Sequence, residues 1–499
     1  MTMEFLTYGI GAVLVWLVAM RLRSVVARQW LYLIASLLFY FSWGSWLILV
    51  LLFSALMNYG LGEWLRKRLS AGRLWTGILL NLALLSIFKY LPLLGGTAPT
   101  DSPLSSFRRI LVPLGVSFWT FQALSYLFEL YREEELNPTR LEFFLYMAFW
   151  PTVLQGPICR MSSMLPQFRQ DWSVSEEDLK TGVRRVSMGI FMAVLAEVMS
   201  GGLYPGAGID AAFNDTTRQF SGVDVWCLIL GYAFQLYFSF CGFCHIVIGG
   251  ARLFGIRLQE NFDRPYLSTT ISEFWTRWHM SLSFWIRDFL FLPLATMRRE
   301  LWWRNLSLVI AMFVFGLWHG GSVLFMMWGI YHGLLLVVHR QWQELRKRMG
   351  FEWSGALPTA VSGCLTFGAV CLGYIFFRSE SSGQAFAMWK AIVDLRSYRD
   401  FGFAPSLYFM TLVAAIGYFA VIGGGALLDR LGEYAGLREG TLRSQPGNRV
   451  AGWLTTLLRT LADERWIWIT PVVLVLTIYL SVIFQPGQAE TGIVMYALF

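Results

Sequence analysis

Long apolar runs alternate along the chain with short segments that hold most of the Lys and Arg residues. A run of roughly 20 apolar residues can cross a bilayer as a helix, and short loops rich in Lys and Arg stay on the cytoplasmic side. The first run, Thr7 to Met20, precedes Arg21 and Arg23 and is followed by no small-residue cleavage site. It therefore predicts a first transmembrane helix rather than a cleaved signal peptide, with the N-terminus outside.

The second apolar run, residues 31–64, ends in a basic cluster that begins at Arg66. A single crossing would leave this cluster outside, so we expect two short helices that turn near Ser42 to Ser45. Residues 143–157 form a short apolar run with two prolines, which is typical of a re-entrant or broken segment that lines a cavity. Further membrane helices are expected over residues 75–90, 110–131, 186–203, 223–251, 361–377, 407–428 and 466–483, with a basic cytoplasmic segment over 430–465.

Composition agrees with this pattern. The 499 residues are 56% hydrophobic and only 14% charged, which excludes a disordered chain and an ordinary soluble domain. The net charge is +8, and the basic residues lie beside the apolar runs, where they set topology and contact anionic lipid. No basic block stands on a soluble domain, so membrane lipids are expected partners and nucleic acid is not. The six cysteines show no framework spacing.

Residues 261–294 are rich in aromatic residues yet too polar to span a bilayer. We expect a pair of short interfacial helices on the cytoplasmic side, the first of them capped by Thr270 or Ser272. Their tryptophans suit the headgroup zone, where amphipathic rings settle; they are Trp275, Trp278 and Trp285. His279 in this segment belongs either to a surface helix or to the mouth of a tunnel.

His319 follows the apolar stretch 308–318 and precedes Gly320, which places it at the end of a helix or at a break within the bilayer. Ionisable side chains at that depth are costly and usually functional. The alternative is a core histidine bonded to a backbone carbonyl. His332 lies in the returning helix and fits packing as well as function, whereas His339 belongs to a solvated basic group.

Three motifs in this region carry a resemblance to a known family. They are E-F-W-T-R-W-H-M-S-L-S-F-W-I-R-D-F (273–289), G-L-W-H-G (316–320) and W-G-I-Y-H-G (328–333), supported by P-L-G-V-S-F-W-T-F-Q-A-L-S-Y (113–126), Q-G-P-I-C-R (155–160) and N-F-D-R-P-Y (261–266). Together they resemble the membrane-bound O-acyltransferase (MBOAT) family in its bacterial branch. The tail to Phe499 is more similar to the alginate O-acetyltransferase subgroup than to the shorter teichoic acid D-alanyl transferases, although residues 277–289 are at least as similar to the latter.

The resemblance implies an all-α polytopic membrane protein. Its fold would be a ring of tilted transmembrane helices, with re-entrant and interfacial helices, around a central tunnel. Residues 1–380 would form the MBOAT-like acyltransferase core, and residues 381–499 a C-terminal extension with additional transmembrane helices. The implied location is the bacterial cytoplasmic (inner) membrane, which the chain would cross several times.

The resemblance also implies O-acyl transfer, most directly O-acetylation of an exopolysaccharide. A thioester donor, acetyl-CoA or an acyl carrier, would enter from the cytoplasm, and the acyl group would pass to a hydroxyl reached from outside. The acceptor is often an SGNH-type extracytoplasmic partner that then modifies a polysaccharide. The family's essential histidine maps onto His319, the expected general base. Its second histidine maps onto His279. Either His279 or a backbone N–H near Gly320 could hold the oxyanion.

Arginines on the cytoplasmic side are candidates to bind the phosphates of the donor, because a guanidinium group matches the geometry of phosphate. They are Arg264, Arg277, Arg287, Arg298 and Arg299. Contact with lipid headgroups is the alternative for each of them. No tightly bound cofactor and no metal site are expected.

Other interpretations stay open at this point. D-alanyl transfer to teichoic acid fits the same motifs, and a lipid or ion transporter could place histidines along a pore without any acyl transfer. Residues 234–245 depart from the family pattern, with Cys241, Cys244 and His245 where relatives carry other polar groups. These three side chains could hold a metal ion at helical spacing, but small packing residues are favoured.

Overall fold

The computed structural model of this chain describes residues 2–420, apart from 98–101, 103–105, 108, 172, 203–205, 207 and 351–354. Within this range every regular element is helical, which confirms the all-α class. Six segments in it are long and apolar enough to cross a membrane, judged by length and composition. The chain is therefore a multi-pass membrane protein, and the outside position of its N-terminus stays a prediction.

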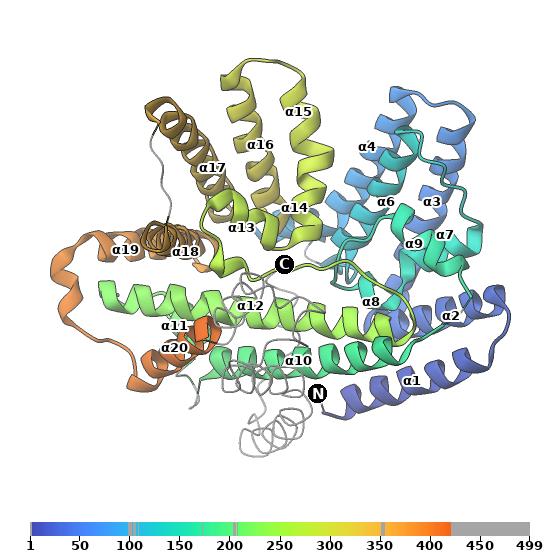
Figure 1. Cartoon of the computed structure of the whole chain (residues 1–499), viewed down its shortest axis with the longest axis horizontal. Helices are drawn as coiled ribbons and strands as arrows, with labels where there is room; N and C mark the ends of the chain where they lie inside the picture. The colour runs from blue at the N-terminus through green and yellow to red at the C-terminus, as the bar shows by residue number, and fades with distance from the viewer. Residues whose placement is uncertain are drawn as a thin grey trace, which may run out of the picture.

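The first helices occupy one side of the molecule (Figure 1) and are α1 (Thr2–Arg21), α2 (Val25–Gly44), α3 (Ile48–Lys67) and α4 (Ala71–Lys89). Between α2 and α3 the chain turns at Ser45, whose φ of 36° is one that L side chains rarely adopt, and continues through the 3-10 helix η1 (Ser45–Leu47). The expected division of the run 31–64 into two helices is thus confirmed. Ser24 begins α2 by accepting a hydrogen bond from the backbone N–H of Ala27.

The next helices are α5 (Leu91–Thr97), α6 (Val116–Tyr131), α7 (Arg140–Ala148), α8 (Trp150–Val153) and α9 (Met161–Arg169). A capping box of Thr139 and Glu142 begins α7. The helical path is interrupted at Phe149 between α7 and α8, and the backbone N–H of Trp150 donates to Ser36 Oγ at 3.1 Å. The expected broken segment over 143–157 is present, and it lies in the protein interior.

Two long helices, α10 (Glu176–Gly201) and α12 (Gly222–Leu253), lie side by side across the molecule, with the short α11 (Ile209–Asn214) between them in sequence (Figure 1). A Cβ atom on Gly189 would lie 2.4 Å from the carbonyl oxygen of Gly242, so any side chain there would force the two helices apart. Of the six candidate spans, α12 is the most buried, at 83%.

The segment rich in aromatic residues forms η3 (Pro265–Leu267), α13 (Ile271–Arg277), α14 (Met280–Ile286), a π-helix (Arg287–Phe291) and α15 (Leu292–Thr296). Thr270 caps α13, as expected, by accepting from the N–H of Glu273. The expectation that the three tryptophans lie in the headgroup zone was wrong, because Trp275, Trp278 and Trp285 are buried in the core. The two short helices pack inside the bundle, which removes their rings from lipid.

The last described helices are α16 (Leu301–His319), α17 (Val323–Met349), α18 (Ala356–Arg378), α19 (Ser382–Val393), η5 (Leu395–Arg399) and α20 (Pro405–Tyr418). In Figure 1 the helices from α13 to α17 rise at the upper left and centre, and α3 and α4 rise at the upper right. The helix expected over 407–428 is described only as far as residue 420. The segments 430–465 and 466–483 lie outside the described residues.

Candidate active site

Three histidines from different elements line one small cavity between α12, α13, α16, α17 and α18. Its volume is about 20 Å³, enough for about one water molecule. The residues that line it are Leu236, Phe240, Phe274, Trp275, Trp278, His279, His319, Trp328, His332, Val370, Tyr374 and Phe377. His279 and His319, which lie 40 positions apart in sequence, both line this cavity.

His319 is the last residue of α16, and close packing of α16 on α17 carries it into the cavity. A Cβ atom on Gly316 would lie 2.2 Å from the carbonyl oxygen of Phe325, so only glycine permits this approach. Aromatic rings surround the imidazole, with the centroids of Trp318, Trp328 and Phe377 at 4.7, 5.1 and 5.0 Å from its own. The ring therefore lies in an apolar environment, where an imidazole is held in its neutral form.

Lys89 and Tyr90, at the end of α4, contact the C-terminal end of α16 just before His319. Lys89 Nζ donates to the carbonyl oxygen of Trp318 and lies 4.8 Å above the Trp318 ring. Tyr90 Oη donates to the carbonyl oxygen of Leu317 at 3.0 Å. Carbonyl groups at the end of a helix lack helical partners, so these two side chains cap α16. Sequence analysis missed them, although a basic residue at the end of an apolar run was visible.

His279 precedes α14 in a left-handed backbone conformation, with φ at 42°. Its Nδ1 lies 3.1 Å from Oδ1 of Asn261, a residue that is fully buried. The same Oδ1 accepts from the backbone N–H and the hydroxyl of Ser281, at 3.1 and 2.8 Å. Asn261 belongs to the motif N-F-D-R-P-Y, but its contact with His279 had not been predicted.

These hydrogen bonds determine which nitrogen of His279 carries the proton. A backbone N–H can only donate, so the Asn261 atom that it reaches is the carbonyl oxygen. Nδ1 of His279 must then donate to that oxygen, which leaves Nε2 of a neutral ring with a lone pair. Nε2 is buried and has no hydrogen-bond partner among the described residues. Burial lowers the pKa of the His279 imidazole, because desolvation disfavours its charged form.

His332 lies on α17 between the rings of Trp275 and Trp328, whose centroids are 5.1 and 5.0 Å from that of its imidazole. It is buried and lines the cavity, but no hydrogen bond from the part of the chain that the structure describes sets its tautomer. His339, seven residues and about two helical turns after His332, is partly buried and does not line the cavity. Of these two histidines, only His332 can contact a bound group.

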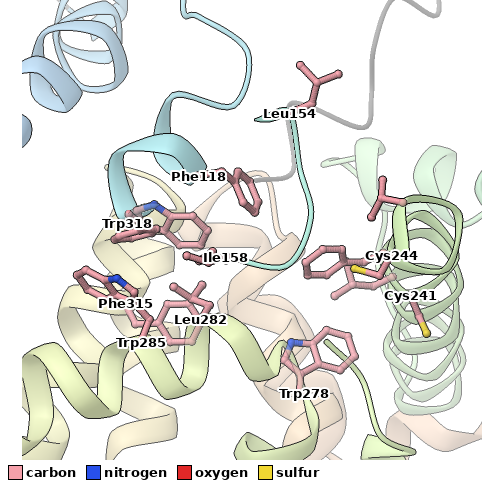
Figure 2. Close-up of a cluster of buried hydrophobic side chains, with 14 of the residues drawn as sticks. Phe118, Leu154, Ile158, Cys241, Cys244, Trp278, Leu282, Trp285, Phe315 and Trp318 are labelled. Carbon is pink, nitrogen blue, oxygen red and sulfur yellow. The ribbon is translucent and has the colours of Figure 1, made fainter. Parts of the chain in front are cut away.

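Aromatic side chains from several elements separate the histidines from the surrounding helices. Figure 2 shows Phe118 of α6, Leu282 and Trp285 of α14, and Phe315 and Trp318 of α16 in one buried cluster. The rings of Phe121 and Trp285 lie 4.5 Å apart, and Trp285 Nε1 donates to Ser125 Oγ at 2.9 Å. This cluster beside the cavity is therefore closely packed, although none of these side chains lines the cavity itself.

The five arginines proposed as phosphate ligands lie outside the lining of the cavity. Arg277 pairs with Glu273 at 2.8 Å, and Arg287 pairs with Asp288 at 2.7 Å. Arg298 lies over the rings of Trp302 and Trp303, Arg299 is exposed, and Arg264 adopts a left-handed backbone conformation. Arg298 and Arg299 precede the start of α16, whereas His319 is its last residue. The length of α16, roughly 28 Å at 1.5 Å per residue, therefore separates these two arginines from His319. Phosphate binding by the five arginines stays a prediction.

Cys244 has a specific place in this arrangement. Nδ2 of Asn261 donates to Cys244 Sγ at 3.3 Å, which agrees with the orientation of the amide given above. Among the described residues, no group of three or more His, Cys, Asp and Glu side chains could hold a metal ion. Cys241, Cys244 and His245 therefore do not form the metal site that their spacing allowed.

Comparison with known proteins agrees with the motifs. A family model described as MBOAT, membrane-bound O-acyltransferase family, matches residues 61–382. "Peptidoglycan O-acetyltransferase" of Helicobacter pylori is 31% identical over 410 residues, covering 74% of this chain and 74% of that protein. "Probable alginate O-acetylase AlgI" of Pseudomonas aeruginosa is 30% identical over 389 residues, covering 74% and 71%. "Teichoic acid D-alanyltransferase" of Bacillus subtilis is 27% identical over 347 residues, covering 66% and 82%.

The family match contains all three histidines of the cavity and spans more than half of the chain. The similar proteins are named for transfer of acetyl or D-alanyl groups. The chain belongs to the membrane-bound O-acyltransferase family and is an O-acyltransferase.

Proposed function

We propose that this chain transfers an acyl group, most directly acetyl, from a cytoplasmic thioester to a hydroxyl acceptor reached from the other side of the membrane. The observation that carries this proposal is the cavity itself, where His279 and His319 meet inside a wall of aromatic rings. A thioester is already activated. The protein then needs only to align it with a hydroxyl, remove the hydroxyl proton and exclude water.

His319 is the general base in this proposal. The acceptor oxygen attacks the thioester carbonyl carbon while its proton passes to a nitrogen of His319, and a C–O bond forms. The C–S bond then breaks, the leaving thiolate takes the proton from the imidazolium, and His319 returns to its neutral state. One ester and one thiol are produced from one thioester and one alcohol, and no cofactor is consumed.

The size of the cavity favours a short acyl group. Its volume of about 20 Å³ leaves little room beyond a methyl group unless the aromatic wall moves. Phe377, near the end of α18, lies 5.0 Å from the ring of His319 and 5.1 Å from those of Phe325 and Trp328, measured between centroids. Its ring therefore limits the space beside the proposed base.

Phe377→Ala is expected to relax the selectivity for acyl length. With acetyl-CoA and butyryl-CoA compared as donors, the ratio of butyryl to acetyl transfer should rise by about tenfold or more, because each methylene in an apolar pocket changes selectivity by about that much. Phe386→Ala is the matched control, since Phe386 lies on α19 and is 73% exposed. An unchanged ratio in folded Phe377→Ala would contradict a limit set by this ring.

Further parts of the proposal follow from the family. We place the chain in the bacterial cytoplasmic membrane with its N-terminus outside. The donor is acetyl-CoA or an acyl carrier, whose phosphates contact cytoplasmic arginines such as Arg277 and Arg287. The acceptor is an SGNH-type extracytoplasmic partner that acetylates an exopolysaccharide. The relatives named for peptidoglycan and alginate O-acetylation support acetyl transfer to a polysaccharide, and the D-alanyltransferases support the alternative acyl group.

The proposal is tested with purified protein in sealed lipid vesicles that enclose the SGNH-type partner together with a polysaccharide acceptor. Acetyl-CoA labelled in the acetyl group is added outside, and labelled ester inside the vesicles is measured together with free CoA. We expect both products to appear in equal amounts. A D-alanyl carrier thioester serves as the competing donor. Movement of lipid or ions without any release of CoA would support a transporter instead and would end the acyltransfer proposal.

A further inference from the structure

The hydrogen bonds of Asn261 bear on how the cavity handles a proton, and this inference rests on the proposed role of His319 as base. When His319 takes a proton, a positive charge forms in an apolar cavity. Such a charge is costly unless an acceptor receives the N–H groups of the imidazolium. The identity of that acceptor is the question that the side chains around the cavity answer.

The described residues that line the cavity include neither Asp nor Glu. The indole groups of Trp275, Trp278 and Trp328 can only donate. The hydroxyl of Tyr374 is hydrogen-bonded to that of Tyr266 at 3.2 Å. Because Tyr266 donates to the carbonyl oxygen of Ala233, Tyr374 is the donor in this pair and its oxygen can still accept. An imidazole lone pair is a stronger acceptor than a phenol oxygen, and only His279 has a tautomer that the surrounding structure sets.

We propose that Asn261 is a positioning residue that keeps the proton of His279 on Nδ1, so that Nε2 accepts a hydrogen bond from the protonated ring of His319, directly or through one water molecule. His279 then acts through His319. It does not hold the oxyanion, because a neutral ring in this tautomer has no N–H directed into the cavity. The backbone N–H of Gly320 is no candidate either, since it donates to the carbonyl oxygen of Gly316 at 3.4 Å.

The proton balance of this arrangement is simple. The acceptor alcohol loses its proton to His319, and the imidazolium N–H donates to Nε2 of His279 while the tetrahedral intermediate exists. His319 then returns the proton to the leaving thiolate. His279 and Asn261 gain and lose no proton overall, so the hydrogen bond between them, at 3.1 Å, is the same before and after the reaction.

Two features favour this role over simple packing. His279 holds a φ of 42°, a conformation that costs free energy for a residue with a Cβ atom and is more frequent at functional sites. In addition, an amide at position 261 orients the imidazole without burying a negative charge, which a carboxylate at this fully buried position would do. The structure thus obtains the orientation found in carboxylate–histidine pairs from a neutral group.

The first test reads the tautomer directly by nitrogen-15 NMR of the full chain in lipid bilayers, with histidine labelled. The chain has only five histidines, and His279→Gln identifies the signals of His279. We expect a protonated Nδ1 and an unprotonated Nε2 in the wild type, and a shift toward a protonated Nε2 in Asn261→Leu. A protonated Nε2 in the wild type would overturn the inference. Because this measurement needs no activity, it separates failure of the inference from failure of the proposed function.

The second test is kinetic and uses Asn261→Asp. A carboxylate next to Nδ1 raises the pKa of His279, so the ring becomes protonated at higher pH and Nε2 stops accepting. The acidic limb of the kcat profile should therefore move to higher pH, with KM for acetyl-CoA within about twofold of the wild type. Asn261→Leu should lower kcat by about tenfold or more. Since Asn261→Leu could fail to fold, the Asp variant carries the kinetic test.

Asn137→Asp is the matched control, since Asn137 is exposed and its Oδ1 accepts from Arg66, which a carboxylate can also do. Its profile should coincide with that of the wild type. If Asn261→Asp lowers kcat without moving the acidic limb, Asn261 has a structural role alone and the inference is wrong.

Discussion

His319→Ala is expected to abolish acyl transfer while leaving the amount of protein in the membrane unchanged. The imidazole at the end of α16 is the proposed proton acceptor, and we expect that neither of the other two lining imidazoles, His279 and His332, reaches the acceptor hydroxyl from its own element. General base catalysis contributes about 100-fold to 10,000-fold in rate. Consumption of labelled acetyl-CoA should therefore fall by at least about 100-fold, with the protein level checked by immunoblot.

The matched control is His339→Ala, because His339 lies on α17 outside the lining of the cavity. It should keep wild-type activity. His319→Gln should be as inactive as the alanine variant, since an amide preserves some packing but cannot take up a proton near neutral pH. Appreciable transfer by either His319 variant would show that another group removes the hydroxyl proton.

Local signals in the sequence predicted much of the helical framework. The position of the basic residues required a turn near Ser45, and the structure has it there with η1 as the link. Thr270 marked the start of α13, because its side chain accepts a hydrogen bond from the backbone N–H of Glu273 three residues later. Gly320 marked the end of α16 and thus the position of His319. Such signals depend on neighbours within a few residues, which a single sequence displays.

Tertiary contacts account for what the sequence did not predict. Trp278 and Trp285 have the composition of an interfacial helix, but Trp278 is buried against the ring of Tyr266 and Trp285 against that of Phe121. Asn261 contacts His279 across 18 positions, and its role depends on the exact amide orientation. Lys89 contacts Trp318 across 229 positions. Periodicity and caps contain no information about pairs so far apart, whereas the family motifs identified the histidines without their partners.

Lys89 is the residue beyond the cavity whose loss should affect transfer most. Its ammonium group donates to the carbonyl oxygen of Trp318 and lies above the indole of the same residue, directly before His319. Lys89→Met would leave that carbonyl without its partner and free the end of α16 to shift. A displacement of about 1 Å at a catalytic group can lower a rate about 100-fold, so we expect kcat to fall by about 10-fold to 100-fold.

The comparison that tests this role uses Tyr90→Phe and Lys390→Met beside Lys89→Met. Tyr90→Phe removes one hydrogen bond to the carbonyl oxygen of Leu317 and should have a smaller effect in the same direction. Lys390 is exposed on α19, so its replacement should leave kcat unchanged. Transfer is measured with labelled acetyl-CoA in vesicles, and thermal unfolding is followed by tryptophan fluorescence. A Lys89→Met protein with wild-type kcat would show that the cap stabilises α16 without positioning His319. The imidazole of His319 would then keep its place even though the carbonyl oxygen of Trp318 has lost the Lys89 ammonium group.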